Sequence, residues 1–236
     1  MNILLISGHG AGDPGALGNG YEEAALTREV VALLKIKLTP YAKVTVFDTT
    51  KNMYAYLKSH SFNFKEFDYV LEVHFNAFQK AFTPDGKNKG VEILVHSSEK
   101  GVGVENEILK NISALGFTNR GIKRPNLQNM NICKGRQGVS YALIEVCFID
   151  DADDMALYTS KKSAVIDAIV KGIKEGFGLG KTSQAEKYEL TEVRDIVSAL
   201  SERDIITDTA LWTEKLTQDK NSYWLARKCA NFILNM

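Results

Sequence analysis

The chain has 236 residues, of which 44% are hydrophobic and 25% charged, so it is long enough for one α/β domain and a small second unit. Its 29 lysines and arginines balance 29 aspartates and glutamates, and nothing in this charge points to nucleic acid or a membrane surface as the main partner. No apolar run approaches the ~20 residues of a membrane span, so we expect no membrane insertion.

Short runs rich in Val, Ile and Leu alternate with amphipathic stretches through the first three quarters of the chain. The predicted strands are 2–7, 43–47, 69–75, 90–96 and 141–147. The predicted helices are 22–38, about 52–60, 99–114, 151–158 and 161–176. This alternation predicts an α/β fold, a mostly parallel twisted sheet with helices on both faces. Such sheets place ligand sites at the carboxyl ends of their strands.

Three residues with metal-ligating side chains fall at strand ends or at a helix start. His9 follows the first predicted strand and lies in the glycine-rich loop 8–15, His74 ends the third strand, and Glu23 begins the first helix. Two imidazoles and one carboxylate are a typical ligand set for a catalytic zinc, with a fourth position left open for water. The pattern therefore indicates metal-assisted hydrolysis.

The same glycine-rich loop has a second interpretation. Residues 10–15 satisfy G-x-G-x-x-G after a strand, and the second strand leads to Asp48, where a ribose-binding acid can lie in a dinucleotide-binding fold. In such a fold, however, the helix starts within the motif, so that its N-terminus faces the pyrophosphate. Here Pro14 and three further glycines keep the chain irregular until about Tyr21, which favours the metal site.

The composition changes after Gly176. Residues 176–184 are typical of a helix end followed by a linker, and the segment beyond 187 has no Gly or Pro and carries helical periodicity. The expected helices lie near 189–203, 207–219 and 221–235, the second capped by Asp208 or Thr207. The predicted organisation is a main domain, a linker and a small all-α domain, at 1–178, 179–187 and 188–236.

Several ordered motifs resemble the zinc-dependent N-acetylmuramoyl-L-alanine amidases of the amidase-3 type, a family of bacterial autolysins and phage endolysins. The first is the stretch 7–27, which contains SGHGAGDPGA and GNGYEEAALT. EVHFNA at 72–77 resembles the strand of the second zinc histidine, and LIEVCFI at 143–149 resembles the strand of the catalytic glutamate. Segments 90–93 and 119–123 look like the family's next strand and the loop before its last strand. The resemblance covers residues 1 to about 178.

The resemblance implies roles for four residues. His9, Glu23 and His74 match the ligands of Zn²⁺, and Glu145 matches the catalytic acid/base. A carboxylate beside the metal can take a proton from the attacking water and return it to the leaving amine. An apolar strand suits Glu145 to that role, because desolvation raises the pKa of a carboxyl group.

The adjacent Glu22 is the alternative to Glu23. The family's glutamate lies three residues after a glycine and three before Leu-Thr, and both spacings select Glu23. Three further residues, Asn76, Arg120 and Lys123, are candidates for orienting the substrate. The sequence departs from the family at Ala25, where an acid is common, and at Cys147, where glycine is common.

By this resemblance the main domain is a zinc amidase that cleaves the bond between N-acetylmuramic acid and L-alanine in peptidoglycan, its partner being a glycan strand with its stem peptide. The chain starts without a signal peptide, so we expect a phage endolysin that accumulates in the host cytoplasm and is released to the wall through another protein. By analogy with two-part endolysins, residues 188–236 are expected to bind a cell-wall ligand.

Two other functions stay open at this point. Another zinc peptidase on the same fold, such as a carboxypeptidase, needs a positive pocket for a free carboxylate, for which the sequence offers Arg120, Lys123, Arg124 and Arg136. A non-catalytic wall-binding protein is the alternative outside enzymes, and the intact ligand set with Glu145 argues against it.

Overall fold

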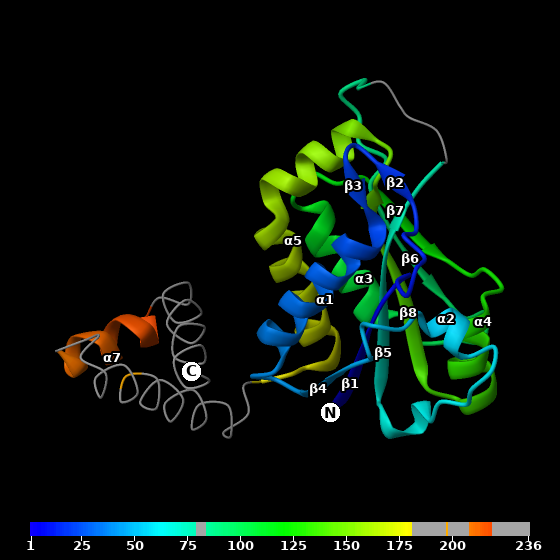
Figure 1. Cartoon of the computed structure of the whole chain (residues 1–236), viewed down its shortest axis with the longest axis horizontal. Coiled ribbons are helices and arrows are strands. Elements are labelled where there is room, and N and C mark those ends of the chain that lie inside the picture. Colours follow the sequence, from blue (N-terminus) through cyan, green and yellow to red (C-terminus); the bar gives the residue numbers. More distant parts are fainter. Residues whose placement is uncertain (79–83, 181–196, 198–207, 219–236) are drawn as a thin grey trace. The chain divides into compact units, whose positions relative to one another are not determined.

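The computed structural model describes residues 1–78, 84–180, 197 and 208–218 (Figure 1). The chain forms two compact units, Met1–Gly180 and Lys181–Met236. Among the described residues, no helix is both long enough and apolar enough to cross a membrane.

A six-stranded sheet in the order β4-β1-β5-β8-β6-β7 forms the centre of the first unit. Its strands in chain order are β1 Asn2–Ser7, β4 Lys43–Val46, β5 Tyr69–Asn76, β6 Val91–Val95, β7 Asn119–Lys123 and β8 Ser140–Phe148. All neighbouring strands are parallel except β6 and β8, which are antiparallel. The predicted mostly parallel sheet is confirmed, and each of the five predicted strands is present.

Among the described residues, three strands were not predicted. The segment 119–123, expected as a loop, is the edge strand β7, because parallel pairing with β6 satisfies its backbone groups. In addition, Leu17–Gly18 (β2) and Tyr21–Glu22 (β3) pair as a short antiparallel hairpin within the region expected to be irregular.

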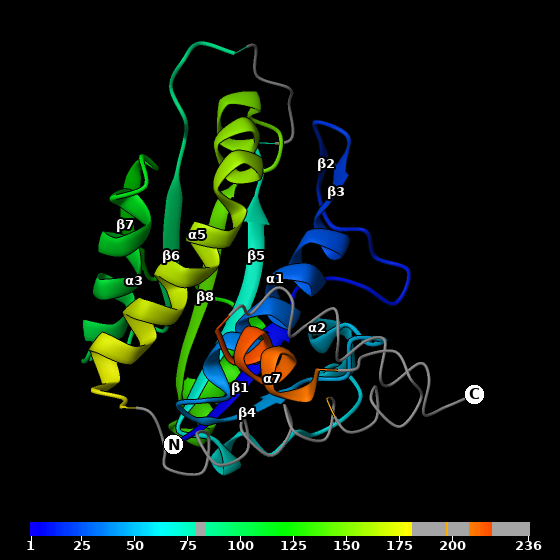
Figure 2. The same ribbon diagram turned by 90° about the vertical axis from the view of Figure 1, so that its left-hand side faces the viewer.

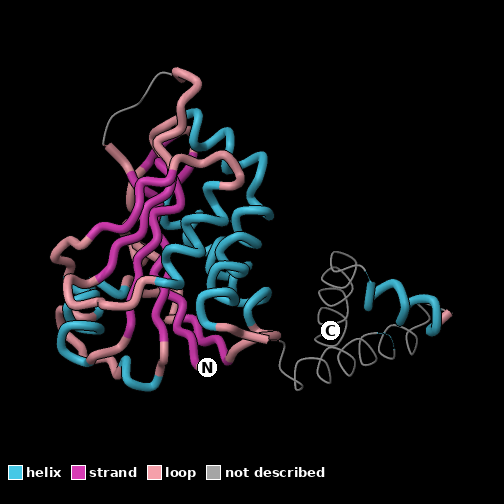
Figure 3. The backbone as a smooth tube through the Cα atoms, turned by 180° about the vertical axis from the view of Figure 1, so that it is seen from behind, coloured by secondary structure: helices cyan, strands magenta, loops and turns pink. Residues whose placement is uncertain are grey.

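Helices cover both faces of the sheet, as predicted. The helices α1 Glu23–Leu38, α3 Gly103–Ser113 and α5 Ala152–Phe177 lie over one face (Figure 2). Shorter elements lie on the opposite side of the sheet (Figure 3). They are α2 Met53–Tyr56, α4 Gln128–Met130 and the π-helical turn Asn131–Arg136. The alternation of side chains along each strand sends one set of apolar residues into each of two buried clusters. The two helices predicted at 151–158 and 161–176 are joined in α5 across a kink at Lys161.

The order of the strands brings three carboxyl ends together. The neighbours β1, β5 and β8 are parallel, and they end at Ser7, Asn76 and Phe148. Ser7 pairs with Val73 in the register of the sheet, and His74 pairs with Glu145. Side chains at or just beyond these ends therefore meet at one edge of the sheet.

The second unit is described in part. Helix α7 spans Thr209–Gln218, within the helix predicted at 207–219, and the carboxylate of Asp208 accepts a hydrogen bond from the backbone N–H of Leu211 at 2.9 Å. Asp208 is one of the two residues predicted to cap this helix. The helix predicted at 221–235, and that at 189–203 apart from Val197, lie outside the described residues.

Candidate active site

The loop after β1 presents His9 in an uncommon backbone conformation. His9 has φ of +62°, in the left-handed region that costs energy for a residue with a side chain. The loop is closed by reciprocal backbone hydrogen bonds between Gly10 and Asp13, at 2.7 and 3.1 Å. From α1, the Arg28 guanidinium donates to the carbonyl oxygens of Gly8 at 3.3 Å and of His9 at 3.1 Å. These contacts hold the strained residue at the carboxyl edge of the sheet.

Glu23, the first residue of α1, lies between the two histidines and is almost fully buried. Its Oε2 accepts a hydrogen bond from the backbone N–H of Ala16 at 2.9 Å and lies 3.0 Å from Nε2 of His9. Its Oε1 accepts from the backbone N–H of Phe75 at 3.0 Å and lies 3.0 Å from Nδ1 of His74. Burial alone raises the pKa of Glu23, but the contacts with His74 and His9 outweigh it and hold that pKa well below its ordinary value.

Each histidine ring also touches a second carboxylate on its far side. His9 Nδ1 lies 2.9 Å from Oδ2 of Asp13, and His74 Nε2 lies 3.1 Å from Oε1 of Glu72. Burial lowers the pKa of His74, but Glu23 and Glu72 raise it well above its ordinary value. The pKa of His9 is also raised, because hydrogen bonds to Glu23 and Asp13 outweigh the effect of its burial. The three carboxylates thus favour positive charge on the two imidazole rings.

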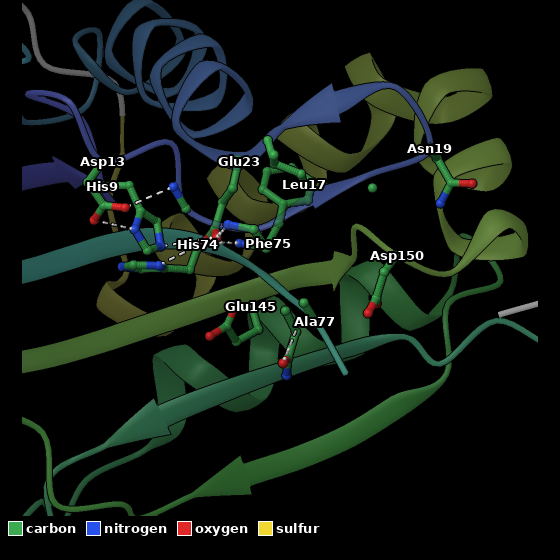
Figure 4. Close-up of a pocket in the computed structure, with 14 residues that line it drawn as sticks. His9, Asp13, Leu17, Asn19, Glu23, His74, Phe75, Ala77, Glu145 and Asp150 are labelled. Atoms are coloured by element: carbon green, nitrogen blue, oxygen red, sulfur yellow. Dashed lines mark hydrogen bonds and ion pairs between the residues drawn. The ribbon is translucent and has the colours of Figure 1, made fainter. Parts of the chain in front are cut away.

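The donor set fits a metal ion. Ligand atoms of His9, Glu23 and His74 all lie within 4.8 Å of one another (Figure 4). The structure brings in Glu23 rather than Glu22, which is exposed on the hairpin. Two ring nitrogens and one carboxylate oxygen match the ligands that zinc takes in catalytic sites.

Glu145 reaches the same pocket from β8. It is paired in register with His74, and its Oε2 is buried without a hydrogen-bond partner among the described residues. Burial raises the pKa of Glu145 to about 7, the charge of Glu23 adds to this rise, and the charge of His74 opposes it. A carboxyl group with this pKa can both accept and donate a proton near neutral pH.

The pocket has a volume of about 790 Å³, within the range of ligand-binding clefts. Its walls are the loop and hairpin from His9 to Asn19, the end of β5 and the start of the segment after β8 (Figure 4). Leu17 on the hairpin, which lines the pocket, is 67% exposed, and Phe75 on β5 and Ala77 just after this strand line the pocket as well. The cluster therefore lies in a cleft that has both polar and apolar walls.

The three predicted substrate residues are placed differently. Asn76 lines the pocket, and its Nδ2 donates to Oε1 of Glu92 at 2.8 Å. Arg120 is one step further away, because its Nε donates to Oε2 of the same Glu92 at 2.8 Å. Lys123 lies at the exposed end of β7 and does not line the pocket. Glu92 thus links Asn76 to Arg120, a connection that the sequence analysis missed.

Asp13 and Glu72 were also missed as partners of the histidines. A signal for Glu72 was present, because residues two apart on a strand share a face and Glu72 precedes His74 by two. The dinucleotide-binding interpretation finds no support. Helix α1 begins at Glu23, after the hairpin, so its N-terminus is not part of the loop 10–15.

Comparison with known proteins agrees with this geometry. The N-acetylmuramoyl-L-alanine amidase family (Amidase_3) matches residues 3–175. A sporulation-specific N-acetylmuramoyl-L-alanine amidase of Bacillus subtilis is 28% identical over 204 residues, which cover 80% of this chain and 73% of that protein. The endolysin of Bacillus phage SPP1 is 28% identical over 183 residues, covering 74% of this chain and 64% of the endolysin.

Solved structures share the fold. The catalytic domain of an endolysin targeting Clostridia Difficile has a TM-score of 0.58 at 22% identity, covering 74% of this chain and 97% of that domain. The catalytic domain of CwlV, an N-acetylmuramoyl-L-alanine amidase from Bacillus (Paenibacillus) polymyxa, has a TM-score of 0.56 at 21% identity, covering 76% of this chain and all of that domain.

Proposed function

The chain belongs to the N-acetylmuramoyl-L-alanine amidase family, and we propose that its catalytic centre is a zinc site of His9, Glu23 and His74 with Glu145 as acid and base. It is a peptidoglycan hydrolase that cleaves the amide bond between N-acetylmuramic acid and L-alanine. The observation that carries the proposed centre is Oε2 of Glu145, a buried oxygen without a partner among the described residues, in the pocket that holds the His–Glu cluster.

His9, Glu23 and His74 would hold the zinc ion, which would lower the pKa of the attacking water and polarise the scissile carbonyl group. Side chains of the protein perform the proton transfers and contact the substrate. Glu145 accepts the proton of the attacking water and passes it to the nitrogen of the departing L-alanine, because an amide nitrogen leaves only after protonation. The raised pKa of Glu145, about 7, suits both transfers. Asn76, oriented by Glu92, offers a polar side chain on the pocket wall to the substrate.

The similarity to a phage endolysin supports a role in cell lysis. In this proposal the enzyme is made in the host cytoplasm, reaches the wall through another protein, and uses residues 188–236 to bind a wall ligand. Removing residues 181–236 is then expected to lower sedimentation of the protein with purified walls, while cleavage of soluble peptidoglycan fragments stays unchanged. Equal sedimentation of the full and shortened chains would contradict the targeting role.

Digestion of purified peptidoglycan with and without a zinc chelator tests the reaction. The expected products are new N-terminal L-alanine without new reducing sugar ends, and they should disappear with the chelator and return with added zinc. New termini at other amino acids would instead indicate a peptidase or carboxypeptidase. Binding to walls without any new ends would indicate the non-catalytic alternative.

A further inference from the structure

Glu72 is a buried carboxylate surrounded by hydrogen-bond donors. Asn129 Nδ2 donates to both of its oxygens, at 3.2 and 3.1 Å, and the hydroxyl of Tyr141 donates to Oε2. His74 Nε2 lies 3.1 Å from Oε1. Glu72 is 4% exposed, and Val70 and Leu143 of the second apolar cluster lie on the same face of the sheet. An ionised carboxylate in such surroundings is costly unless charge-assisted hydrogen bonds offset its desolvation.

The donors around Glu72 decide which nitrogen of His74 carries hydrogen. A carboxylate that already accepts from an amide and a hydroxyl acts as an acceptor, so the His74 nitrogen facing it, Nε2, must be the N–H. In neutral His74 the lone pair is therefore on Nδ1. Nδ1 is the nitrogen that faces Glu23, at 3.0 Å.

His9 shows the opposite arrangement. Its Nδ1 contacts Asp13 at 2.9 Å, and its Nε2 faces Glu23 at 3.0 Å. Asp13 is itself held in place, because its Oδ2 also accepts from Nδ2 of Asn52 at 3.0 Å. Both imidazoles thus present one nitrogen to the centre of the cluster and the other to an outer carboxylate, although they use different nitrogens.

We propose that Glu72 is a positioning residue: held by Tyr141 and Asn129, it fixes His74 in the Nε2–H tautomer and leaves Nδ1 free for the metal. This inference rests on the proposed zinc site. Outer-shell carboxylates of this kind fix the ring orientation and raise the basicity of a ligating histidine, and their loss weakens metal binding. Glu72 does not line the pocket, so its effect acts through His74.

Zinc affinity of the purified full chain, measured by competition with a chromophoric chelator, tests the proposal without any use of activity. Glu72→Gln is expected to weaken zinc binding about 10–100-fold. The neutral amide turns an NH₂ group toward the donors of Asn129 and Tyr141 or of His74, and it therefore holds the His74 ring poorly. Tyr141→Phe, which removes one donor from Glu72, is expected to cause a smaller loss. Imidazole ¹H–¹⁵N correlation spectra of the zinc-loaded wild type should show His74 protonated at Nε2.

Glu105→Gln is the matched control. Glu105 is also a buried carboxylate that accepts a tyrosine hydroxyl, from Tyr69 at 2.9 Å, but it lies on α3, under the other face of the sheet. This variant is expected to lose thermal stability and keep the zinc affinity of the wild type. A merely structural role for Glu72 predicts the same behaviour for both glutamates.

The outcomes distinguish the positioning role of Glu72 from the zinc site on which it rests. Unchanged zinc affinity in folded Glu72→Gln, or a zinc-loaded His74 protonated at Nδ1, overturns the positioning role while the zinc site itself stands. If Glu72→Gln does not fold, unchanged affinity in Tyr141→Phe together with Nδ1 protonation overturns it. If the wild type binds no zinc, or His74→Ala binds it equally well, the proposed zinc centre fails and takes this inference with it.

Discussion

Replacing Glu145 with Gln is expected to remove catalysis and at the same time stabilise the metal-free protein above neutral pH. Gln is close to Glu in size but cannot carry a proton between water and the leaving amine. General acid–base catalysis contributes about 10²–10⁴-fold to a rate, so we expect peptidoglycan cleavage to fall by at least that range. Zinc affinity should change little, because Glu145 is not one of the three proposed ligands.

The stability change follows from the raised pKa. The pKa of Glu145 rises from 4.5 to about 7 in the folded protein, chiefly because burial disfavours the charged form. At 1.36 kcal/mol per unit, ionised Glu145 costs the folded state roughly 3 kcal/mol. Because the pKa of Glu145 is raised on folding, its protonated form contributes its full stabilisation below about pH 4.5. This contribution is lost as the pH rises through about 7.

Thermal unfolding of the metal-free proteins at about pH 5 and about pH 8 measures the difference. For a chain of this size 1 kcal/mol shifts Tm by about 2–4 °C, so at the higher pH the Tm of Glu145→Gln should exceed that of the wild type by up to about 10 °C. The gap should nearly close at the lower pH. Glu22→Gln is the control, because Glu22 is exposed, and this variant should change neither activity nor Tm.

Two results would refute this reasoning. Wild-type cleavage by Glu145→Gln would show that Glu145 does not transfer the proton. A Tm difference that does not grow with pH would show that Glu145 is not held at a raised pKa by its surroundings. Loss of cleavage with a pH-independent Tm would retain the catalytic role and reject only the electrostatic argument.

Three further substitutions test the support of the site. In Gly8→Ala the new Cβ would lie 2.4–2.7 Å from three ring atoms of His74, so the ring must shift by about 1 Å. We expect about a 10²-fold loss of cleavage and weaker zinc binding, measured by chelator competition. Arg28→Lys removes guanidinium hydrogen bonds to the strained loop of His9, which should lower the unfolding free energy by about 1–3 kcal/mol in a urea titration. An unchanged midpoint would show that Arg28 does not stabilise this loop. Both carboxylate oxygens of Asp154 accept hydrogen bonds from backbone N–H groups, and Asp154→Asn turns an NH₂ group toward these donors. We expect the unfolding free energy to fall by about 2–4 kcal/mol. A Tm equal to that of the wild type would contradict this.

The sequence by itself determined the central strands and the long helices. Strands β1, β5 and β8 are short apolar runs that can be buried on both faces, and α1 has an apolar stripe at helical spacing. Because a parallel sheet gathers the carboxyl ends of its strands, the sequence also placed His9, His74 and Glu145 at the same edge of the sheet.

Only the tertiary structure decided the remaining parts of the fold. The edge strand β7 has the sequence NRGIK, which lacks the pattern of a strand, and it is extended because β6 offers backbone partners. In β7, therefore, contacts with distant residues outweigh weak local preferences. The break that the sequence predicts between 158 and 161, by contrast, is present as a kink at Lys161, where the backbone of α5 is not helical (φ −121°, ψ 17°).

The same division applies to the site. The residue types and their strand ends predicted which side chains approach one another, because side-chain direction alternates along a strand and is a local property. The donors that hold Glu72 were not predictable, since Glu72 meets Tyr141 and Asn129 only through the pairing of β5 with β8 and the packing of α4 beneath them. The order of the strands in the sheet, which no local pattern contains, therefore decides which donors hold Glu72 against His74.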